Sequence, residues 1–386
     1  MKKLTCLLLI LFFSSFCGPN KEKAKESQQN LALNLNEGEI VENYIEPHKI
    51  EGETTDFYLE PVSSIDFERD NIAELGLISA GYFGIDSSEN VYFASSRNQR
   101  NCIYKFDREG NFVTSFGRKG QGPGEIQVVR RFGIDNEDRI IVQDHTNKKI
   151  LFFKTDGSLI KETRFDKKFQ AMYPLSNGNY IVYWDNRPEI KRDGDYYPEG
   201  FSLCNSNLEE IKILDIYKAT PLPLKGVKGT NINPIFFWII SNGYIYIANE
   251  DREYEILQYD FDGNLLKRIR KEFIHNKVSK DYIEKTKKSF ARANRKVWFP
   301  EHWPPFSSFF TDNEGRIFVK TYEKGADDSV FIFDIFNTEG KFVGRKNLNI
   351  YSEQFVYAKV IGDHLYCIQD KESGYKEFVN YKMIWR

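Results

Sequence analysis

Residues 104–165 read YKFDREGNFVTSFGRKGQGPGEIQVVRRFGIDNEDRIIVQDHTNKKILFFKTDGSLIKETRF, and this stretch decides the fold. Its apolar runs are about 4–7 residues long, are rich in Ile, Val, Phe and Tyr, and alternate with polar residues, as half-buried strands do. The turns between them carry Asp, Asn and Gly, which tolerate the left-handed backbone of tight hairpins. No helical period persists. The stretch is therefore predicted to form antiparallel β structure.

The same pattern returns along the chain at a spacing of nearly fifty residues. The sequence FGID at residues 83–86 returns 49 residues later at 132–135. The acid-glycine turn at 109–110 returns 47 residues later at 156–157. A repeat of this length indicates propeller blades, in which each four-stranded meander buries its faces only against its neighbours.

This period predicts an all-β fold, a six-bladed β-propeller with four-stranded antiparallel blades. The blades are expected at about residues 80–117, 130–166, 170–216, 235–273, 305–348 and 354–386. The segment from Phe57 to Ser79 has strand character and precedes the first blade. It is expected to supply the outer strand of the last blade and so to fasten the ring.

The second repeat resembles the NHL type of propeller repeat. In NHL repeats a strand ends in an aspartate, an asparagine follows three residues later, and a basic residue leads into an apolar strand. Asp144, Asn147, Lys148 and Ile150 match that pattern. The stretch as a whole resembles the bacterial six-bladed β-propeller lipoproteins, a mostly uncharacterised family. The resemblance implies the fold and an exported lipoprotein, but no particular activity.

Composition and charge exclude several classes of protein. The aromatic share is 15%, with 32 Phe and 22 Tyr, as expected where stacked sheets need flat, rigid side chains between them. The net charge of -2 is too small to attract nucleic acid, so no such partner is expected. A monomer is expected. Cys102, Cys204 and Cys367 lie in predicted strands and are predicted to be buried thiols, not a disulfide framework.

Residues 1–17 are predicted to be a lipoprotein signal peptide. Lys2 and Lys3 precede an apolar run of about 10 residues, whereas a membrane span needs about 20. The sequence that ends at Cys17 resembles a bacterial lipobox, which makes Cys17 the expected site of lipidation. Phe16 departs from the usual small residue, so an ordinary secretory signal remains as the alternative. Either signal would export the chain.

Residues 18–55 are predicted to be a flexible polar tether, because the composition offers too little apolar surface for folding. The propeller is then expected at residues 56–386. Gly18 and Pro19 follow Cys17 directly, without the aspartate associated with retention in the inner membrane. We therefore expect a lipid anchor in the outer membrane or at the cell surface, with a soluble periplasmic protein as the alternative.

Residues 274–304 break the period and predict a helical insertion between the fourth and fifth blades. Ser279 is the expected N-cap, and Tyr282, Ile283 and Phe290 can share one face. Eight basic and two acidic side chains lie within residues 277–296. They could meet an anionic partner, or could be the solvated face of a helix packed over the rim. The aromatic and proline residues that follow could form a wall of a binding surface or pack the insert against the ring.

The glycine-rich loop at residues 117–124 is interpreted as a tight connection between blades. A phosphate-binding loop needs a helix after its glycines, whereas a strand pattern follows here, and Pro123 lacks an amide donor. Metal-binding motifs such as HxH, HxxxH and CxxC are missing from the sequence. Asp144 and His145 could help to hold a divalent ion such as calcium, but a turn-capping role for Asp144 is favoured. No cofactor is expected.

Two functions follow from this architecture. Connections between blades and loops after each second strand emerge on one face, and loops on a rigid scaffold often carry function. The first hypothesis is a non-catalytic, exported lipoprotein that binds a protein or glycan with this face. The second is a metal-dependent hydrolase or lyase, similar to propeller lactonases, with its site at the axial mouth. The residues expected on the binding face are Arg118, Lys119, Gln121, Asp144, His145, Asn147, His275, Trp298, His302 and Trp303.

Overall fold

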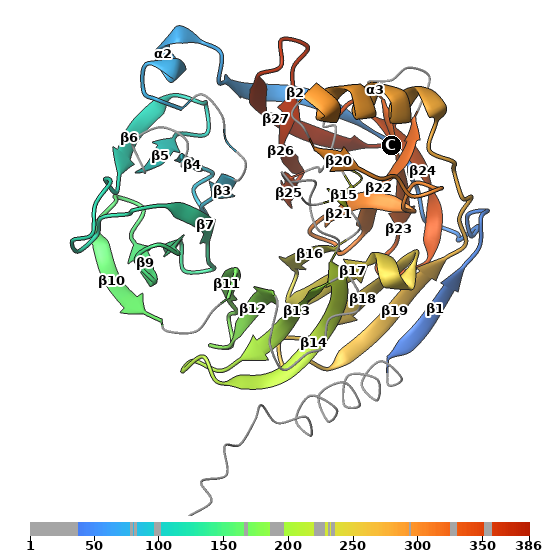
Figure 1. The fold of residues 1–386 in the computed structure, drawn as a ribbon, viewed down its shortest axis with the longest axis horizontal. Helices are drawn as coiled ribbons and strands as arrows, with labels where there is room; N and C mark the ends of the chain where they lie inside the picture. The colour runs from blue at the N-terminus through green and yellow to red at the C-terminus, as the bar shows by residue number, and fades with distance from the viewer. Residues whose placement is uncertain are drawn as a thin grey trace, which may run out of the picture.

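Six antiparallel sheets stand around a central axis as the blades of a propeller in the described part of the chain (Figure 1). The structure is a computed structural model, and it describes residues 38–77, 80, 83–95, 102–165, 169–185, 197–219, 228–230, 232, 236–292, 295–324, 330–350 and 357–386. The predicted signal peptide, Cys17 and the first part of the predicted tether lie outside these ranges. The predicted six-bladed fold is confirmed.

Each blade runs from an innermost strand beside the axis to an outer edge strand (Figure 1). Blade I contains β3 (Phe83–Ile85), β4 (Val91–Ser95), β5 (Cys102–Phe106) and β6 (Phe112–Phe116). Blade II contains β7 (Val129–Ile134), β8 (Ile140–Asp144), β9 (Lys149–Phe153) and β10 (Leu159–Arg164). Blade III contains β11 (Ala171–Pro174), β12 (Tyr180–Asp185), β13 (Tyr197–Cys204) and β14 (Glu210–Ala219).

The last three blades continue the meander but also recruit strands from the start of the chain. Blade IV contains β16 (Phe236–Ser241), β17 (Tyr244–Asn249), β18 (Glu255–Tyr259), β19 (Leu265–Lys271) and the added strand β1 (Glu39–Asn43). Blade V contains β21 (Phe306–Thr311), β22 (Ile317–Lys324), β23 (Phe331–Phe336) and β24 (Phe342–Leu348). Blade VI contains β25 (Tyr357–Ile361), β26 (His364–Asp370), β27 (Lys376–Trp385) and β2 (Phe57–Asp66).

Helices are few in the described ranges. A short helix α2 (Asp70–Ala73) follows β2, and the 3-10 turn η1 (Glu250–Arg252) joins β17 to β18. The predicted insertion forms helix α3 (Lys280–Arg292), after which β20 (Lys296–Val297) pairs with β15 (Lys228–Gly229) in the connection between blades III and IV. None of the described helices has the length and apolar character needed to cross a membrane.

The ring closes through strand β2. This strand pairs antiparallel with β27, from Phe57 opposite Trp385 to Asp66 opposite Glu377. Blade VI is therefore assembled from both ends of the described chain, as the strand character of residues 57–66 predicts. Closure brings blade VI against blade I, so that the first and last sheets bury their faces against each other.

The prediction of a flexible tether is wrong for its second part, because residues 39–43 already form strand β1. Strand β1 pairs in parallel with β19 and extends blade IV to five strands. The chain then passes blade V, where the amide of His48 donates to the carbonyl of Phe342 at 2.8 Å. A strand of five residues contributes too little apolar surface to register in composition, but the free edge of β19 supplies its backbone partners. We call residues 39–66 the N-terminal arm.

Asn43 joins the N-terminal arm to two blades. Its side chain is buried, and Nδ2 donates to the carbonyl of Arg270 at 2.9 Å and to that of Gly340 at 3.0 Å. Its Oδ1 accepts a hydrogen bond from the amide of Phe342 at 2.7 Å. One amide side chain thus links β1 and β19 of blade IV to the β23–β24 hairpin of blade V.

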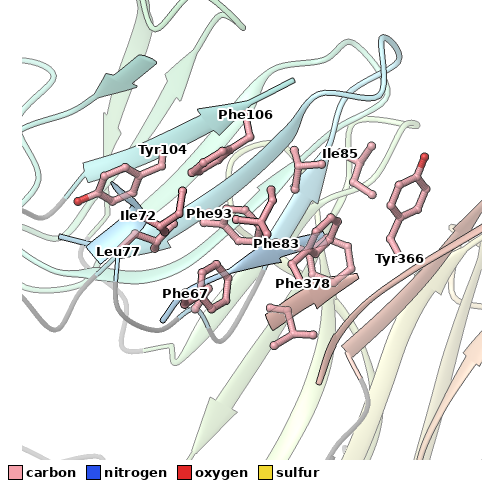
Figure 2. Close-up of a cluster of buried hydrophobic side chains, with 14 of the residues drawn as sticks. Phe67, Ile72, Leu77, Phe83, Ile85, Phe93, Tyr104, Phe106, Tyr366 and Phe378 are labelled. Carbon is pink, nitrogen blue, oxygen red and sulfur yellow. The ribbon is translucent and has the colours of Figure 1, made fainter. Parts of the chain in front are cut away.

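The hydrophobic core is divided among the interfaces between neighbouring blades. Each of the six interfaces has a cluster of buried side chains within the described residues. Figure 2 shows the cluster between blades VI and I, where the ring of Phe378 lies 5.1 Å from that of Phe83 and 5.3 Å from that of Phe93. Burying one such side chain contributes roughly 1.5–3 kcal/mol. The aromatic excess in the sequence therefore fills the spaces between blades.

Many turns between neighbouring strands share one hydrogen bond, in which an Asp or Asn side chain accepts from the amide four residues on. At the β5–β6 turn, Asp107 Oδ1 accepts the amide of Asn111 at 2.8 Å, and Gly110 adopts a φ of +88°. The same side-chain bond to the amide four residues on is made by Asp86, Asp135, Asn205, Asp260, Asp312 and Asn337. Cys102, Cys204 and Cys367 are buried, as predicted.

Replacing Asn43 should destabilise the ring. We expect Asn43→Ala to lower the free energy of unfolding by about 2–4 kcal/mol, because the buried Phe342 amide and the Gly340 carbonyl lose a partner. Chemical denaturation followed by tryptophan fluorescence measures the change. Ile40→Ala in the same strand is the matched control, since this side chain is 48% exposed. Equal effects of the two substitutions would contradict the role given to Asn43.

A cluster of ion pairs at the end of the N-terminal arm should make the stability of the fold depend on pH. Lys371 Nζ lies 2.9 Å from Asp66 Oδ2 and 2.7 Å from Glu68 Oε2. Partial burial raises the pKa of Asp66, but the bonds from Lys371 and from the Glu68 amide outweigh it, so this pKa is lowered. The bond from Lys371 also lowers the pKa of Glu68.

Both carboxylates therefore stabilise the fold above their ordinary pKa values of 3.8 and 4.5, and the contribution is lost as pH falls through the lowered values. The melting temperature of Lys371→Ala should lie below that of the wild type near pH 6 and approach it near pH 2. Thermal melts across this range test the prediction. A difference that stays constant with pH would contradict it.

Candidate binding face

The glycine loop and the turn after β8 are held together by Asp144 and Asn147. Asp144 is fully buried, and its carboxylate accepts the amides of Gln127 at 2.5 Å and Asn147 at 3.2 Å. Asn147 Nδ2 donates to Asp144 Oδ2 at 2.9 Å and to the carbonyl of Gly120 at 3.0 Å. The aspartate and asparagine that resemble the NHL pattern therefore clamp a turn to a loop, and Asp144 has the favoured capping geometry.

A buried lysine fixes the rest of the glycine loop. Lys149 is fully buried, and its Nζ donates to the carbonyl of Gly122 at 2.8 Å and to Glu162 Oε2 at 3.0 Å. The loop then leads into strand β7, so no helix N-terminus follows the glycines. The arrangement matches the interpretation as a tight connection between blades.

The other predicted residues of this region surround the clamp. Arg118 leaves 85% of its side chain exposed while its Nε bonds Glu125 Oε1 at 2.8 Å. Lys119 and Gln121 are exposed. His145 is half-buried, and its ring lies 6.2 Å from that of Phe165. The structure therefore brings these four residues to the clamped loop and turn between blades I and II.

The insert is mounted on blade V through aromatic contacts. Ser279 Oγ accepts the amide of Tyr282 at 3.2 Å, which confirms the predicted N-cap of α3. The ring of Trp303 lies 4.8 Å from that of Tyr282 and stacks at 4.9 Å on that of Tyr322 in β22. Of the two roles expected for the aromatic segment, Trp303 therefore has the second, which is to pack the insert against the ring. Trp298, five residues earlier in the chain, is half-buried.

Two predicted histidines also gather at the base of the insert. The ring of His275 lies 5.7 Å from that of His302, and the ring of Phe273 lies 4.3 Å from that of His275. The amide of Trp303 donates to the carbonyl of Asn276 at 2.8 Å, which ties the two ends of the insert together. His275 is exposed and His302 is half-buried.

The outward side of α3 is strongly basic. Tyr282, Ile283 and Phe290 are half-buried, whereas the helix exposes five cations, none of which forms an ion pair within the described ranges. These cations are Lys280, Lys285, Lys287, Lys288 and Arg292. The segment 277–296 carries eight basic and two acidic side chains, an excess of six positive charges. Since the whole chain carries -2, the other residues together carry -8.

The predicted binding residues thus form two groups. One group surrounds the loop and turn between blades I and II, and the other belongs to the insert between blades IV and V. The two groups lie on opposite sides of the ring (Figure 1). The alternation of strand directions sends both toward the same face of the ring, where they form two separate groups.

A further group of polar side chains belongs to the innermost strands and was missed by sequence reasoning. Burial raises the pKa of Tyr173 in β11 to about 12, an increase that the charge of Arg131 in β7 moderates. Burial likewise raises the pKa of Tyr357 in β25, and Arg131 again opposes the shift. The charge of Arg131 therefore acts on two phenols, from blades III and VI.

Lys359 adds a second cation to this region. Its side chain is exposed, and it has no ion pair within the described ranges. The surrounding protein nevertheless desolvates the ammonium group and lowers its pKa. In the sequence, Lys359 resembles the ordinary polar member of an alternating run in a short strand. The sequence therefore did not mark it as a candidate site residue.

A metal centre lacks support from the described residues. No three His, Cys, Asp or Glu side chains among them lie close enough to hold a metal ion. The side chains identified near the axis are cationic and phenolic instead of carboxylates.

Comparison with known proteins identifies the family. A family model described as a 6-bladed beta-propeller, DUF5128, matches residues 58–291, which is more than half of the chain. The chain belongs to this family. The DUF5128 match covers nearly all of β2, blades I to III, the strands β16 to β19 of blade IV and nearly all of α3. A search of the curated proteins finds no match.

Solved structures share the architecture of this DUF5128 propeller at low sequence identity. A DUF4221 family member from Bacteroides vulgatus has a TM-score of 0.50 and 11% identity, over 86% of this chain and 100% of that chain. A protein of Bacteroides fragilis NCTC 9343 has a TM-score of 0.49 and 15% identity, over 90% of this chain and 100% of that one. Virginiamycin B lyase from Staphylococcus aureus has a TM-score of 0.40 and 11% identity, over 85% and 100% of the two chains. At 11% identity the likeness to the DUF4221 family member shows the fold alone.

Removing the Asp144 carboxylate should loosen the clamped loop. We expect Asp144→Ala to lower the free energy of unfolding by about 2–4 kcal/mol, since the Gln127 and Asn147 amides lose their acceptor. Amide hydrogen exchange in residues 117–128 should accelerate before global unfolding. Asp156→Ala, which removes an exposed turn acid of the same blade, is the control and should leave that exchange unchanged. Unchanged exchange in Asp144→Ala would contradict the clamp.

Proposed function

We propose that this propeller is a non-catalytic, exported binding module that captures an anionic partner, a protein or a glycan, with the outward side of α3. The observation that carries the proposal is the row of five exposed cations on one helix without acidic partners in the described structure. A surface of this kind attracts a partner of opposite charge over distances of about one Debye length, roughly 8 Å at physiological salt.

Rigid mounting of the helix supports the same role. Trp303 lies between Tyr282 of α3 and Tyr322 of blade V, so the helix is anchored by stacked rings. Strand β20 pairs with β15 and ties the end of the insert to the connection between blades III and IV. A binding surface that is ordered before the partner arrives loses less conformational entropy on binding.

The distribution of charge also favours binding of an anionic partner by α3 over nonspecific binding by the whole surface. The segment 277–296 carries an excess of six positive charges, and the remaining residues together carry -8. A partner rich in carboxylates or phosphates is therefore attracted to α3 and repelled, on average, by the rest of the molecule. This polarity orients the propeller toward its partner.

The leader sequence supports placement outside the cytoplasm. Residues 1–17 combine a basic start, a short apolar run and a lipobox-like end at Cys17. We therefore propose a lipoprotein, anchored through Cys17 in the outer membrane or at the cell surface. The resemblance to the bacterial propeller lipoproteins points in the same direction.

The charge of α3 can be tested by reversal. We expect the triple variant Lys285→Glu, Lys288→Glu and Arg292→Glu to bind immobilised polygalacturonate, an acidic glycan probe, about tenfold or more weakly than the wild type. Photo-crosslinking from a probe amino acid at position 288 in intact cells tests for a protein partner. The same reversal at positions 285 and 292 should abolish any crosslinked product.

The control is a triple variant with the same change of charge away from the insert, at the exposed residues Lys49, Lys154 and Arg164. It should retain glycan binding and crosslinking. If both triple variants lose binding to the same degree, net charge and not α3 is responsible. If neither probe engages α3 in the wild type, the proposal is overturned.

A further inference from the structure

A separate cleft opens at the outer edge of the ring between blades I and II. Its volume is about 590 Å³, and it is bounded by the end of β6, the glycine loop, and the corner where β9 turns into β10. Sites for small molecules commonly occupy roughly 300–1,000 Å³. The cleft belongs to blades I and II, whereas the insert lies between blades IV and V on the opposite side of the ring (Figure 1). A ligand in this cleft is therefore independent of the function proposed for α3.

The inner surface of the cleft is apolar. The rings of Phe116 and Phe153 lie 5.4 Å apart there, and Leu159 and Cys102 also line the cleft. Gly157 has a φ of +87°, and a Cβ at this position would lie 2.7 Å from Phe116 Cγ. The glycine therefore allows the turn to approach the ring of Phe116 without covering it by a side chain.

The rim of the cleft is cationic. Arg118 and Lys119 line it and are exposed. The one acid of the lining, Glu125, is already occupied, since Oε1 accepts from Arg118 Nε at 2.8 Å and Oε2 accepts from the Gly122 amide at 2.9 Å. Lys119 has no ion pair within the described ranges. The rim therefore offers positive charge to a ligand.

The wall that carries these cations is already ordered. Lys149 holds the carbonyl of Gly122, and Asn147 holds that of Gly120. The amide of Ile126 donates to the carbonyl of Arg118 at 2.8 Å, which closes the loop on itself. A ligand that enters the cleft does not have to order this loop first.

We propose that the cleft binds a small amphipathic anion. The apolar body of the ligand lies against Phe116, Phe153 and Leu159, and its carboxylate lies between Arg118 and Lys119. Burial of an aliphatic or aromatic body provides the affinity, and the two cations select the negative head group.

Calorimetry on the full chain with three probes of equal chain length tests this assignment. Decanoate should bind at one site, decanol about tenfold or more weakly, and decyltrimethylammonium more weakly still, because only the first matches the rim. Lys119→Glu should weaken decanoate at least tenfold and leave decanol unchanged. Equal affinities for the three probes, or no binding of decanoate, would overturn the proposal.

A matched pair of substitutions on β6 tests the location. Ser115 lines the cleft and is exposed, so Ser115→Trp should fill the cleft and abolish decanoate binding without loss of the fold. Val113 lies two residues earlier in the same strand, is 51% exposed, and does not line the cleft. Val113→Trp should keep wild-type affinity, with thermal melts showing that both variants are folded. Retained binding in Ser115→Trp would place the ligand elsewhere and refute the site.

Discussion

Backbone pairing between β2 and β27 is the constraint on which the rest of the structure depends. Each blade buries its faces only against two neighbours, so six blades are stable together only when the first and last meet. The ladder from Phe57 opposite Trp385 to Asp66 opposite Glu377 makes that junction. The cluster around Phe83, Phe93 and Phe378 then fills the interface that the ladder brings together (Figure 2).

The fold was predictable because the repeat encodes it locally. Alternating runs define strands, and the turn residues fix where each hairpin ends, as at Asp107 and Gly110. Strand β1 was not predictable in the same way. Its five residues contain only two large apolar side chains, Ile40 and Val41, and its stability comes from the edge of β19, which lies far away in sequence.

The candidate site was predictable only in its local parts. The turn of Asp144 and Asn147 is defined by neighbouring residues, and the helix after Ser279 by its cap and apolar face. The groups near the axis could not be found in this way. Arg131, Tyr173 and Tyr357 come from three blades, and only closure of the ring places their strands around one centre. The cleft beside Phe116 and Phe153 likewise exists only where two blades meet.

The N-terminal arm has a consequence for how the protein is made. Its residues in β2 pair with residues that lie 311 to 328 positions further along the chain. During synthesis β2 therefore precedes the final hairpin by most of the chain and must wait for it before it finds its partners. Contacts of such long sequence separation form slowly. The ring therefore cannot close until β27, the last strand of the described chain, has been synthesised.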